Sequence, residues 1–156
     1  MNAARGFTSS RYHALLQLLR TADAVWNLSR IFFSRWKLSP SQFNILNVLR
    51  SERDGISQIE LGRVLITHRS NVTGLVDRLK RRGLVQRKDV AGDKRTYSIV
   101  LSPKGARLLE EILPAYYQRA EQLWERFPSR RAANLASELA RLEKSARLQA
   151  MAEQSP

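Results

Sequence analysis

Hydrophobic residues recur every three or four positions over most of the chain, which is the spacing of helices with one buried face. The first stretch of this kind runs from Ser10 to about Trp36 and includes Leu15, Leu18 and Leu19. It continues for about seven turns, which is longer than the core of a small domain needs. We therefore expect part of this apolar stripe to need a partner.

Two shorter helices are predicted next, and each begins at a recognisable cap. Ser39 is a suitable N-cap, and Pro40 stands at the first helical position, where its missing N–H is not needed. The polar stretch 51–55 ends this second helix. Ser57 and Glu60 then match a capping box, in which each side chain accepts a hydrogen bond from the other residue's backbone N–H. The third helix is expected to run to about residue 65.

A fourth helix is expected to end at Gly83. Thr67 is its predicted N-cap, and glycine commonly follows a helix end in the left-handed conformation. Offsets of three, four and seven place four apolar residues on one face, namely Val72, Leu75, Val76 and Leu79. This face is predicted to be buried, which leaves the opposite face available to solvent or to a partner.

A β-hairpin is predicted after the fourth helix. Two extended segments, 84–89 and 95–101, flank a turn at residues 90–93. The second segment alternates, so we expect one side to pack and the other to stay in water. The two sets are Tyr97, Ile99 and Leu101 on one side and Thr96, Ser98 and Val100 on the other.

Two helices are predicted to complete the chain. Ser102 and Pro103 repeat the pairing of an N-cap with a first-turn proline. Pro114 lies within the apolar pattern that follows, and we expect it to kink this helix or to split it in two. The last helix is predicted from about Arg130. The expected fold class is therefore mainly α, with four helices, a small β-hairpin and two further helices.

The charge of the chain favours a polyanionic partner. Among its 156 residues, 27 are Lys or Arg and 14 are Asp or Glu, which gives a net charge of +13. Each phosphate that a basic side chain neutralises releases condensed counterions. Nucleic acid is therefore the first expectation, and an anionic membrane surface is the second.

The remaining composition excludes several kinds of site. The chain has no cysteine and two histidines, so disulfides and thiolate sites are excluded, and we expect no metal and no cofactor. Its apolar runs are shorter than the roughly 20 residues that cross a bilayer, and its N-terminus lacks the apolar core of a signal peptide. We therefore expect a cytoplasmic protein with no membrane segment.

The outward face of the predicted fourth helix is polar at its start and basic at its end. Small polar side chains suit base edges, whereas a block of positive charge suits phosphate. This gradient is typical of a helix that enters the major groove by its N-terminal end. The predicted DNA-contacting residues are His68, Arg69, Ser70, Asn71, Thr73, Gly74, Asp77, Arg78, Lys80, Arg81 and Arg82. For the last three, a solvated helix end that complements the helix dipole is the ordinary alternative.

The basic character continues into the predicted hairpin. Between residues 63 and 95 there are ten Lys or Arg residues and three acidic ones. A protruding basic tip can enter the narrow and strongly negative minor groove. The residues predicted to contact DNA here are Arg87, Lys88, Asp93, Lys94 and Arg95. Asp93 would repel DNA by itself, so we expect it to hold the Arg95 guanidinium, although ordinary turn chemistry also explains an aspartate at this position.

Several of these segments resemble the multiple-antibiotic-resistance regulator (MarR) family. Residues 38–46 are similar to the start of that family's second helix, and residues 58–84 are similar to its helix-turn-helix. The run Asp93-Lys94-Arg95, followed by Leu101-Ser102 and Gly105, resembles its wing signature, with serine where threonine is frequent. The resemblance covers roughly residues 38–105.

The resemblance implies a winged helix-turn-helix lobe at residues 37–101 and a helical dimerisation region at residues 1–36 and 102–156. It implies a homodimer whose first helix and last two helices interleave, which would supply the partner that the long apolar stripe needs. It also implies that each fourth helix reads one half-site of a pseudo-palindromic operator in double-stranded DNA, with a wing in each flanking minor groove. The expected function is a transcriptional regulator, with repression as the predicted direction.

Many members of that family bind small aromatic ligands and then release DNA, so the resemblance raises a small aromatic effector as a further expectation. Aromatic residues that could line such a pocket are Trp26, Phe32, Trp36, Phe43 and Tyr116. Packing in a core or an interface is the more frequent role of aromatic residues at helical spacing. It is therefore the favoured interpretation for each of them.

Three other classes of protein are weighed against a regulator. An enzyme is disfavoured because the sequence has no nucleophile motif, no phosphate-binding glycine loop and no helical zinc motif. A membrane-surface protein would need a basic amphipathic helix free of core duty, whereas the basic residues gather on the helix-turn-helix. An architectural DNA-binding protein without ligand response stays open as the alternative, and only its lack of sequence preference would distinguish it.

Overall fold

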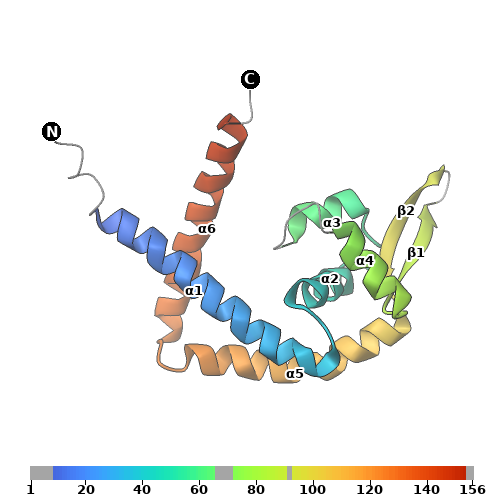
Figure 1. Cartoon of the computed structure of the whole chain (residues 1–156), viewed down its shortest axis with the longest axis horizontal. Coiled ribbons are helices and arrows are strands. Elements are labelled where there is room, and N and C mark those ends of the chain that lie inside the picture. The colour runs from blue at the N-terminus through green and yellow to red at the C-terminus, as the bar shows by residue number, and fades with distance from the viewer. Residues whose placement is uncertain (1–8, 66–71, 91–92, 154–156) are drawn as a thin grey trace. The chain divides into compact units, whose positions relative to one another are not determined.

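The computed structural model describes residues 9–65, 72–90 and 93–153, without the side chains of residues 89, 90 and 93–96. Helix α1 (Ser10–Phe33) runs into a short 3-10 helix, η1 (Ser34–Trp36). The elements that follow are α2 (Pro40–Ser51), α3 (Gln58–Val64), α4 (Val72–Arg81), β1 (Val85–Val90), β2 (Asp93–Leu101), α5 (Pro103–Trp124) and α6 (Ser129–Glu153) (Figure 1). The predicted class, mainly α with a small hairpin after the fourth helix, is confirmed.

The chain divides into two compact units, residues 1–109 and residues 110–156. The first unit contains α1, α2, α3, α4, the hairpin and the first turns of α5. The second contains the rest of α5 and the whole of α6. The predicted division into a DNA-binding lobe and a dimerisation region is a functional one, and it stays a prediction.

The starts of α2 and α3 follow their predicted caps. Ser39 Oγ accepts a hydrogen bond from the Gln42 N–H at 3.2 Å, and Gln42 Oε1 accepts one from the Ser39 N–H at 2.9 Å. The same reciprocal pair joins Ser57 and Glu60 at the start of α3. Gln42 therefore completes a second capping box, which satisfies two backbone N–H groups that the first turn of a helix leaves unpaired. Thr67 lies outside the described residues.

The core of the first unit centres on α2 and α4. Helix α2 contacts α3, α4 and β2, and α4 contacts β1. The predicted inward face of α4 is buried in full, and its residues are Val72, Leu75, Val76 and Leu79. Gly83 follows this helix with a φ of 69°, a left-handed conformation that glycine adopts without a steric cost. The predicted burial of one face of α4 and its predicted end are both confirmed.

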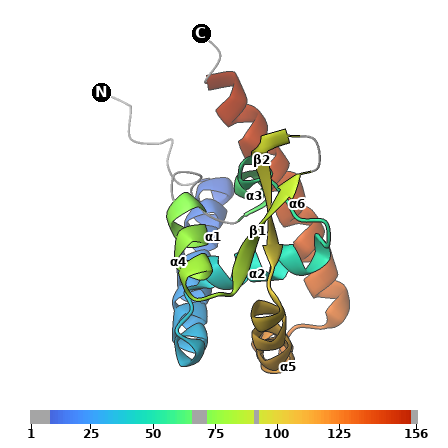
Figure 2. The ribbon, with the colours of Figure 1, turned by 90° about the vertical axis from the view of Figure 1, so that its right-hand side faces the viewer.

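Strands β1 and β2 pair antiparallel beside α4 (Figure 2). The prediction that one side of β2 stays in water is wrong, because Ser98, Ile99 and Val100 are all buried. The segment before α3 packs against β2 and buries these residues. Ile56 forms an isolated bridge with Ile99, and a Cβ added to Gly55 would lie only 2.6 Å from Ser98 Oγ. Alternation along one strand does not reveal a loop that packs on its second face.

Helix α5 begins close against the end of α4. Ser102 Oγ accepts a hydrogen bond from the Gly105 N–H at 2.9 Å and donates one to the Gly83 carbonyl oxygen at 2.7 Å. A Cβ added to Gly105 would collide with the Leu84 carbonyl oxygen, so only glycine fits at this position. The predicted serine cap of α5 is confirmed, and it also holds the segment that follows α4.

Pro114 lies inside α5 without ending it. The helix is continuous from Pro103 to Trp124, so the predicted split does not occur. Helix α6 then runs for 25 residues and has no buried residue. Within the described ranges, no helix combines the length and the apolar character that a membrane span requires.

Candidate nucleic-acid interface

The outward face of α4 is a polar and basic surface opposite the buried face. Its exposed residues are Thr73, Asp77, Arg78, Lys80 and Arg81, and Gly74 is half-buried among them. The apolar residues at offsets of three, four and seven occupy the other side of the helix, so the charged side chains are directed away from the core. Three of them are cations within four consecutive positions, which makes this end of α4 suitable for phosphate.

Several predicted DNA contacts cannot be placed. His68, Arg69, Ser70 and Asn71 lie outside the described residues, and so do the side chains of Asp93, Lys94 and Arg95. The expected pairing of Asp93 with Arg95 therefore stays a prediction. The described part of the interface consists of α3, the helix α4 and the base of the hairpin.

Arg82 has a different environment from the other basic residues at this end of α4. Its guanidinium donates from Nη1 to the Lys37 carbonyl oxygen at 2.6 Å and from Nη2 to the Trp36 carbonyl oxygen at 2.9 Å. Lys37 is left-handed, with a φ of 54°, where the chain turns from η1 toward α2. Arg82 thus ties the C-terminal end of α4 to the turn that precedes α2. Its position in the basic block does not indicate this local role.

The carbonyl group of the residue that follows α4 accepts a hydrogen bond from a cation. Lys104 Nζ donates to the Arg82 carbonyl oxygen at 2.9 Å. A positive charge at a helix C-terminus is favourable because the carbonyl ends of the peptide dipoles gather there. Together with the Gly83 carbonyl, which accepts from Ser102, this contact fixes the end of α4 against the start of α5.

Arg87 lies on the hairpin with its guanidinium over the ring of Tyr97, 4.1 Å from the ring centroid. The register pairs Asp89 with Tyr97, so Arg87 and Tyr97 are diagonal neighbours across the two strands. A guanidinium stacked on an aromatic face keeps its N–H donors in the plane, where they can meet phosphate oxygens. Lys88 is exposed next to it. Both residues lie on β1, the strand that contacts α4, and their predicted contact with DNA stays a prediction.

Gln58 connects the surface of α4 to the hairpin, and the sequence prediction did not include it. Its Nε2 donates to Thr73 Oγ1 at 2.5 Å, and its Oε1 accepts from Tyr97 Oη at 3.2 Å. These contacts join residues 15 and 39 positions apart, so no local pattern indicates them. The only available signal is that a long polar side chain stands at the first position of a short helix next to the predicted DNA-contacting helix.

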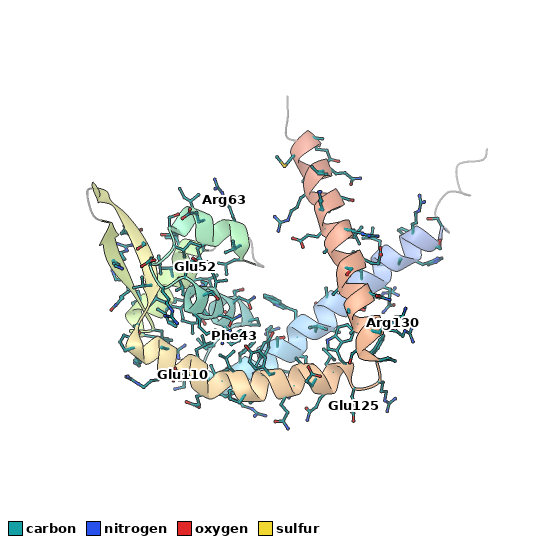
Figure 3. The ribbon with its side chains drawn as sticks, turned by 180° about the vertical axis from the view of Figure 1, so that it is seen from behind. Phe43, Glu52, Arg63, Glu110, Glu125 and Arg130 are labelled. Carbon is teal, nitrogen blue, oxygen red and sulfur yellow. The ribbon has the colours of Figure 1, made fainter. Side chains whose placement is uncertain are left out.

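Arg63 extends the positive surface onto α3, where it is exposed (Figure 3). On the same helix, the pKa of Glu60 is lowered from its ordinary value, first by the hydrogen bond from the Ser57 hydroxyl, then by the Ser57 N–H, and further by the charge of Arg63. The carboxylate is therefore held in its ionised form as part of the capping box. It serves the start of α3 rather than the chemistry of a ligand.

The aromatic residues predicted for an effector site fall into two groups. Phe32, Trp36 and Phe43 belong to one packed cluster in the first unit, together with Phe33. The Phe33 and Phe43 rings are stacked with centroids 4.2 Å apart, and Phe43 lies on the side of α2 nearest α1 (Figure 3). Phe32 and Phe43 are buried, which favours the packing role for both.

Trp26 precedes these rings on α1, and Tyr116 lies on α5. Trp26 is half-buried on α1. Tyr116 belongs to the second unit, where its ring centroid is 6.2 Å from that of Tyr117. An effector pocket lined by the five aromatic residues stays a prediction.

Comparisons with known proteins are consistent with this arrangement. The model of the MarR family matches residues 36–96, which include α2, α3, α4 and the hairpin up to the middle of β2. The HTH-type transcriptional regulator PecS of Dickeya dadantii is 29% identical over 114 residues, which are 72% of this chain and 69% of PecS. The HTH-type transcriptional repressor YetL of Bacillus subtilis is 33% identical over 97 residues, which are 62% of this chain and 58% of YetL.

Among solved structures, a probable transcriptional regulator from Pseudomonas aeruginosa is similar over most of its length. Its TM-score is 0.69 and its sequence identity is 30%, and the match covers 80% of this chain and 93% of the other. The similarity is therefore longer than the matched family segment, residues 36–96. The resemblance that the sequence predicted between residues 38 and 105 is confirmed.

Proposed function

Because the chain belongs to the MarR family of DNA-binding transcriptional regulators, we propose that it binds a pseudo-palindromic operator as a homodimer and represses transcription. The family and these relatives are regulators rather than enzymes. The repressing direction is supported by the name of YetL, and a cytoplasmic location goes with a regulator of chromosomal DNA.

The observation that carries the proposal is the division of α4 into two faces. Four apolar residues on one face are buried in the first unit, so the helix is held by its own chain. The opposite face presents Arg78, Lys80 and Arg81 to solvent, and Arg87 is exposed on β1, the strand that contacts α4. A rigid helix with a cationic outer face beside a cationic hairpin fits the major groove and the phosphates on its edge.

The roles of single residues follow from their environment. Thr73 is exposed at the start of the described part of α4, where a hydroxyl suits a base edge or a nearby phosphate. Arg78, Lys80, Arg81 and Lys88 are assigned to phosphate. The base-reading roles of Arg69, Ser70 and Asn71 and the minor-groove role of Arg95 stay predictions from the sequence.

The homodimer is supported by apolar side chains that the single chain leaves exposed. On α1 these include Leu15, Leu19 and Ile31, and on α6 they include Leu135 and Leu142. Exposed leucines at helical spacing on two long helices are costly in water and favourable against a second copy. We assign the dimer contact to the predicted region, residues 1–36 and 102–156.

A small aromatic effector is a separate part of the proposal. Burial of Phe32 and Phe43 by neighbouring rings supports their packing role. Ligand release of DNA is therefore a separate question, which a screen of small phenolic compounds against a preformed complex with DNA would answer.

The test of the proposed function is selection of DNA from a random pool, followed by binding at fixed salt. We expect a selected site with two inverted half-sites about one helical turn apart, bound roughly a thousandfold tighter than scrambled duplex. Equal affinity for both duplexes would favour the architectural alternative. A selected site without inverted symmetry would contradict the homodimer.

A further inference from the structure

Gln58 lies at the centre of a series of side-chain contacts that crosses the candidate interface. The side-chain amide bridges Thr73 on α4 and Tyr97 on β2, with distances of 2.5 Å from Nε2 to Thr73 Oγ1 and 3.2 Å from Tyr97 Oη to Oε1. Tyr97 in turn carries the Arg87 guanidinium on its ring. One side chain of α3 therefore contacts both the helix and the hairpin proposed to bind DNA.

The direction of these hydrogen bonds determines what Thr73 can offer to DNA. A hydroxyl has one proton and two acceptor lone pairs. Because Gln58 Nε2 donates to Thr73 Oγ1, one lone pair is used and the hydroxyl proton is left for another acceptor. Thr73 is exposed on the outward face of α4, where an acceptor on bound DNA can reach its hydroxyl.

The Gln58 amide is oriented with Nε2 toward Thr73 and Oε1 toward Tyr97. The Tyr97 hydroxyl donates to Oε1, so Nε2 is directed to the other side, toward α4. The reverse amide orientation would make Thr73 the donor to Gln58 and would turn the hydroxyl proton inward. The two orientations thus predict opposite roles for Thr73 in DNA recognition.

We propose that Gln58 is a specificity-determining positioning residue, which sets Thr73 as a hydrogen-bond donor to the DNA and aligns α4 with the hairpin through Tyr97. The proposal rests on the proposed function, since it concerns how the operator is read. Guanine N7 and O6, thymine O4 and phosphate oxygens are acceptors that such a donor can meet. Gln58 itself acts through Thr73 and Tyr97, so its loss should change sequence preference more than general affinity.

The experiment compares wild-type protein and variants on the selected operator and on scrambled duplex at the same salt concentration. Gln58→Met removes both hydrogen bonds and keeps a long, flexible side chain. Gln58→Glu keeps the shape but offers only acceptors, so Thr73 must donate inward. For each variant we expect the ratio of the two affinities to fall about five- to tenfold, and for Gln58→Met the affinity for scrambled duplex should change less than about twofold.

A double-mutant cycle tests the coupling to Thr73. Thr73→Val removes the hydroxyl without a large change of shape and should lower the affinity ratio about tenfold. If Gln58 acts through this hydroxyl, Gln58→Met added to Thr73→Val should cause little further loss, so the two effects are strongly non-additive. Tyr97→Phe keeps the ring under Arg87 and loses only the hydroxyl, and it should lower the ratio about twofold to threefold.

The matched control is Gln17→Met on α1, where Gln17 Nε2 donates to Thr21 Oγ1 at 3.3 Å on an exposed face. This variant should leave the affinity ratio unchanged. Additive losses in the double mutant, or equal losses on both duplexes for Gln58→Met, would overturn the positioning role. A wild-type protein without preference for any selected site would instead overturn the proposed function. Thermal melting of each variant shows whether the lobe is still folded.

Discussion

Helices α4 and α6 are both amphipathic in sequence, but the apolar residues of α4 are buried and those of α6 are exposed. Helix α4 has 10 residues, and its four apolar residues are at most 3% exposed. Helix α6 has 25 residues and none is buried; Leu139 is 38% exposed and Leu142 is 48% exposed. The apolar face of α4 is satisfied within its own unit, whereas that of α6 is not. The comparison teaches that the apolar face of α4 is covered within its own unit and leaves a cationic face outside, whereas the apolar residues of α6 stay exposed in the single chain.

The largest expected effect comes from placing a charge on the exposed apolar face of α6. Leu139→Asp should weaken the proposed dimer by about 3 kcal/mol or more, which is roughly a hundredfold or more in its dissociation constant, because a carboxylate would have to be desolvated in an apolar contact. Sedimentation equilibrium of the variant measures this change. DNA affinity should fall with it, since both half-sites must be bound together.

Lys144→Asp is the matched control for this substitution. It adds the same carboxylate to α6 at an exposed polar position, away from the stripe of leucines. The control should keep the wild-type association state. If Leu139→Asp also keeps the wild-type association state and operator affinity, the apolar face of α6 does not form a dimer contact. The exposed leucines of α6 would then be ordinary solvated residues.

A second prediction concerns how α4 is held by its own unit. Gly105→Ala places a Cβ against the Leu84 carbonyl oxygen, directly after the end of α4. Relief of this overlap requires a backbone shift, so the free energy of unfolding should fall by about 2 kcal/mol. Urea denaturation measures the loss, and Arg107→Ala on the exposed side of α5 is the control. An unchanged urea midpoint for Gly105→Ala would mean that the backbone between α4 and α5 can move enough to accommodate the added Cβ.

A third prediction separates two neighbouring arginines at the end of α4. Arg82→Ala removes both hydrogen bonds to the carbonyl oxygens of Trp36 and Lys37, so the free energy of unfolding should fall by about 1 kcal/mol. Arg81→Ala should leave stability nearly unchanged and should flatten the dependence of DNA affinity on salt by about one phosphate contact. Melting temperatures measure the stability of the two variants, and DNA affinities at several salt concentrations measure the change in phosphate contacts. Identical behaviour of the two variants would contradict the anchoring role of Arg82.

The sequence predicts most of the fold because the signals are local. The Ser57–Glu60 capping box and the inward face of α4 depend on residues within one or two turns of each other, and both are confirmed. The burial on both sides of β2 and the bridge made by Gln58 depend on segments far apart in the chain. Neither local propensity nor spacing carries that information, so both emerge only from the packed structure. The pattern of charge on α4 predicts an interface, but it does not distinguish Arg82, which binds carbonyl groups, from Arg81.

The smallest expected effect concerns the loss of folding stability at acid pH that results from protonation of Glu60 at the start of α3. Because the folded protein lowers the pKa of Glu60, ionised Glu60 stabilises the fold at neutral pH, and this contribution is lost as the pH falls below about 4.5 and through the lowered pKa. Glu60→Gln keeps a capping side chain but cannot ionise, so its stability should depend less on pH in this range than that of the wild type. Melting temperatures between pH 3 and 7, roughly the span over which carboxyl groups titrate, measure the difference. Gln58 is the first residue of the same helix, so the protection of the amides at the start of α3, measured relative to their intrinsic exchange rate at each pH, should also fall in acid for the wild type. If the melting temperatures of the two proteins fall equally as the pH is lowered, the Ser57 cap does not depend on the charge of Glu60.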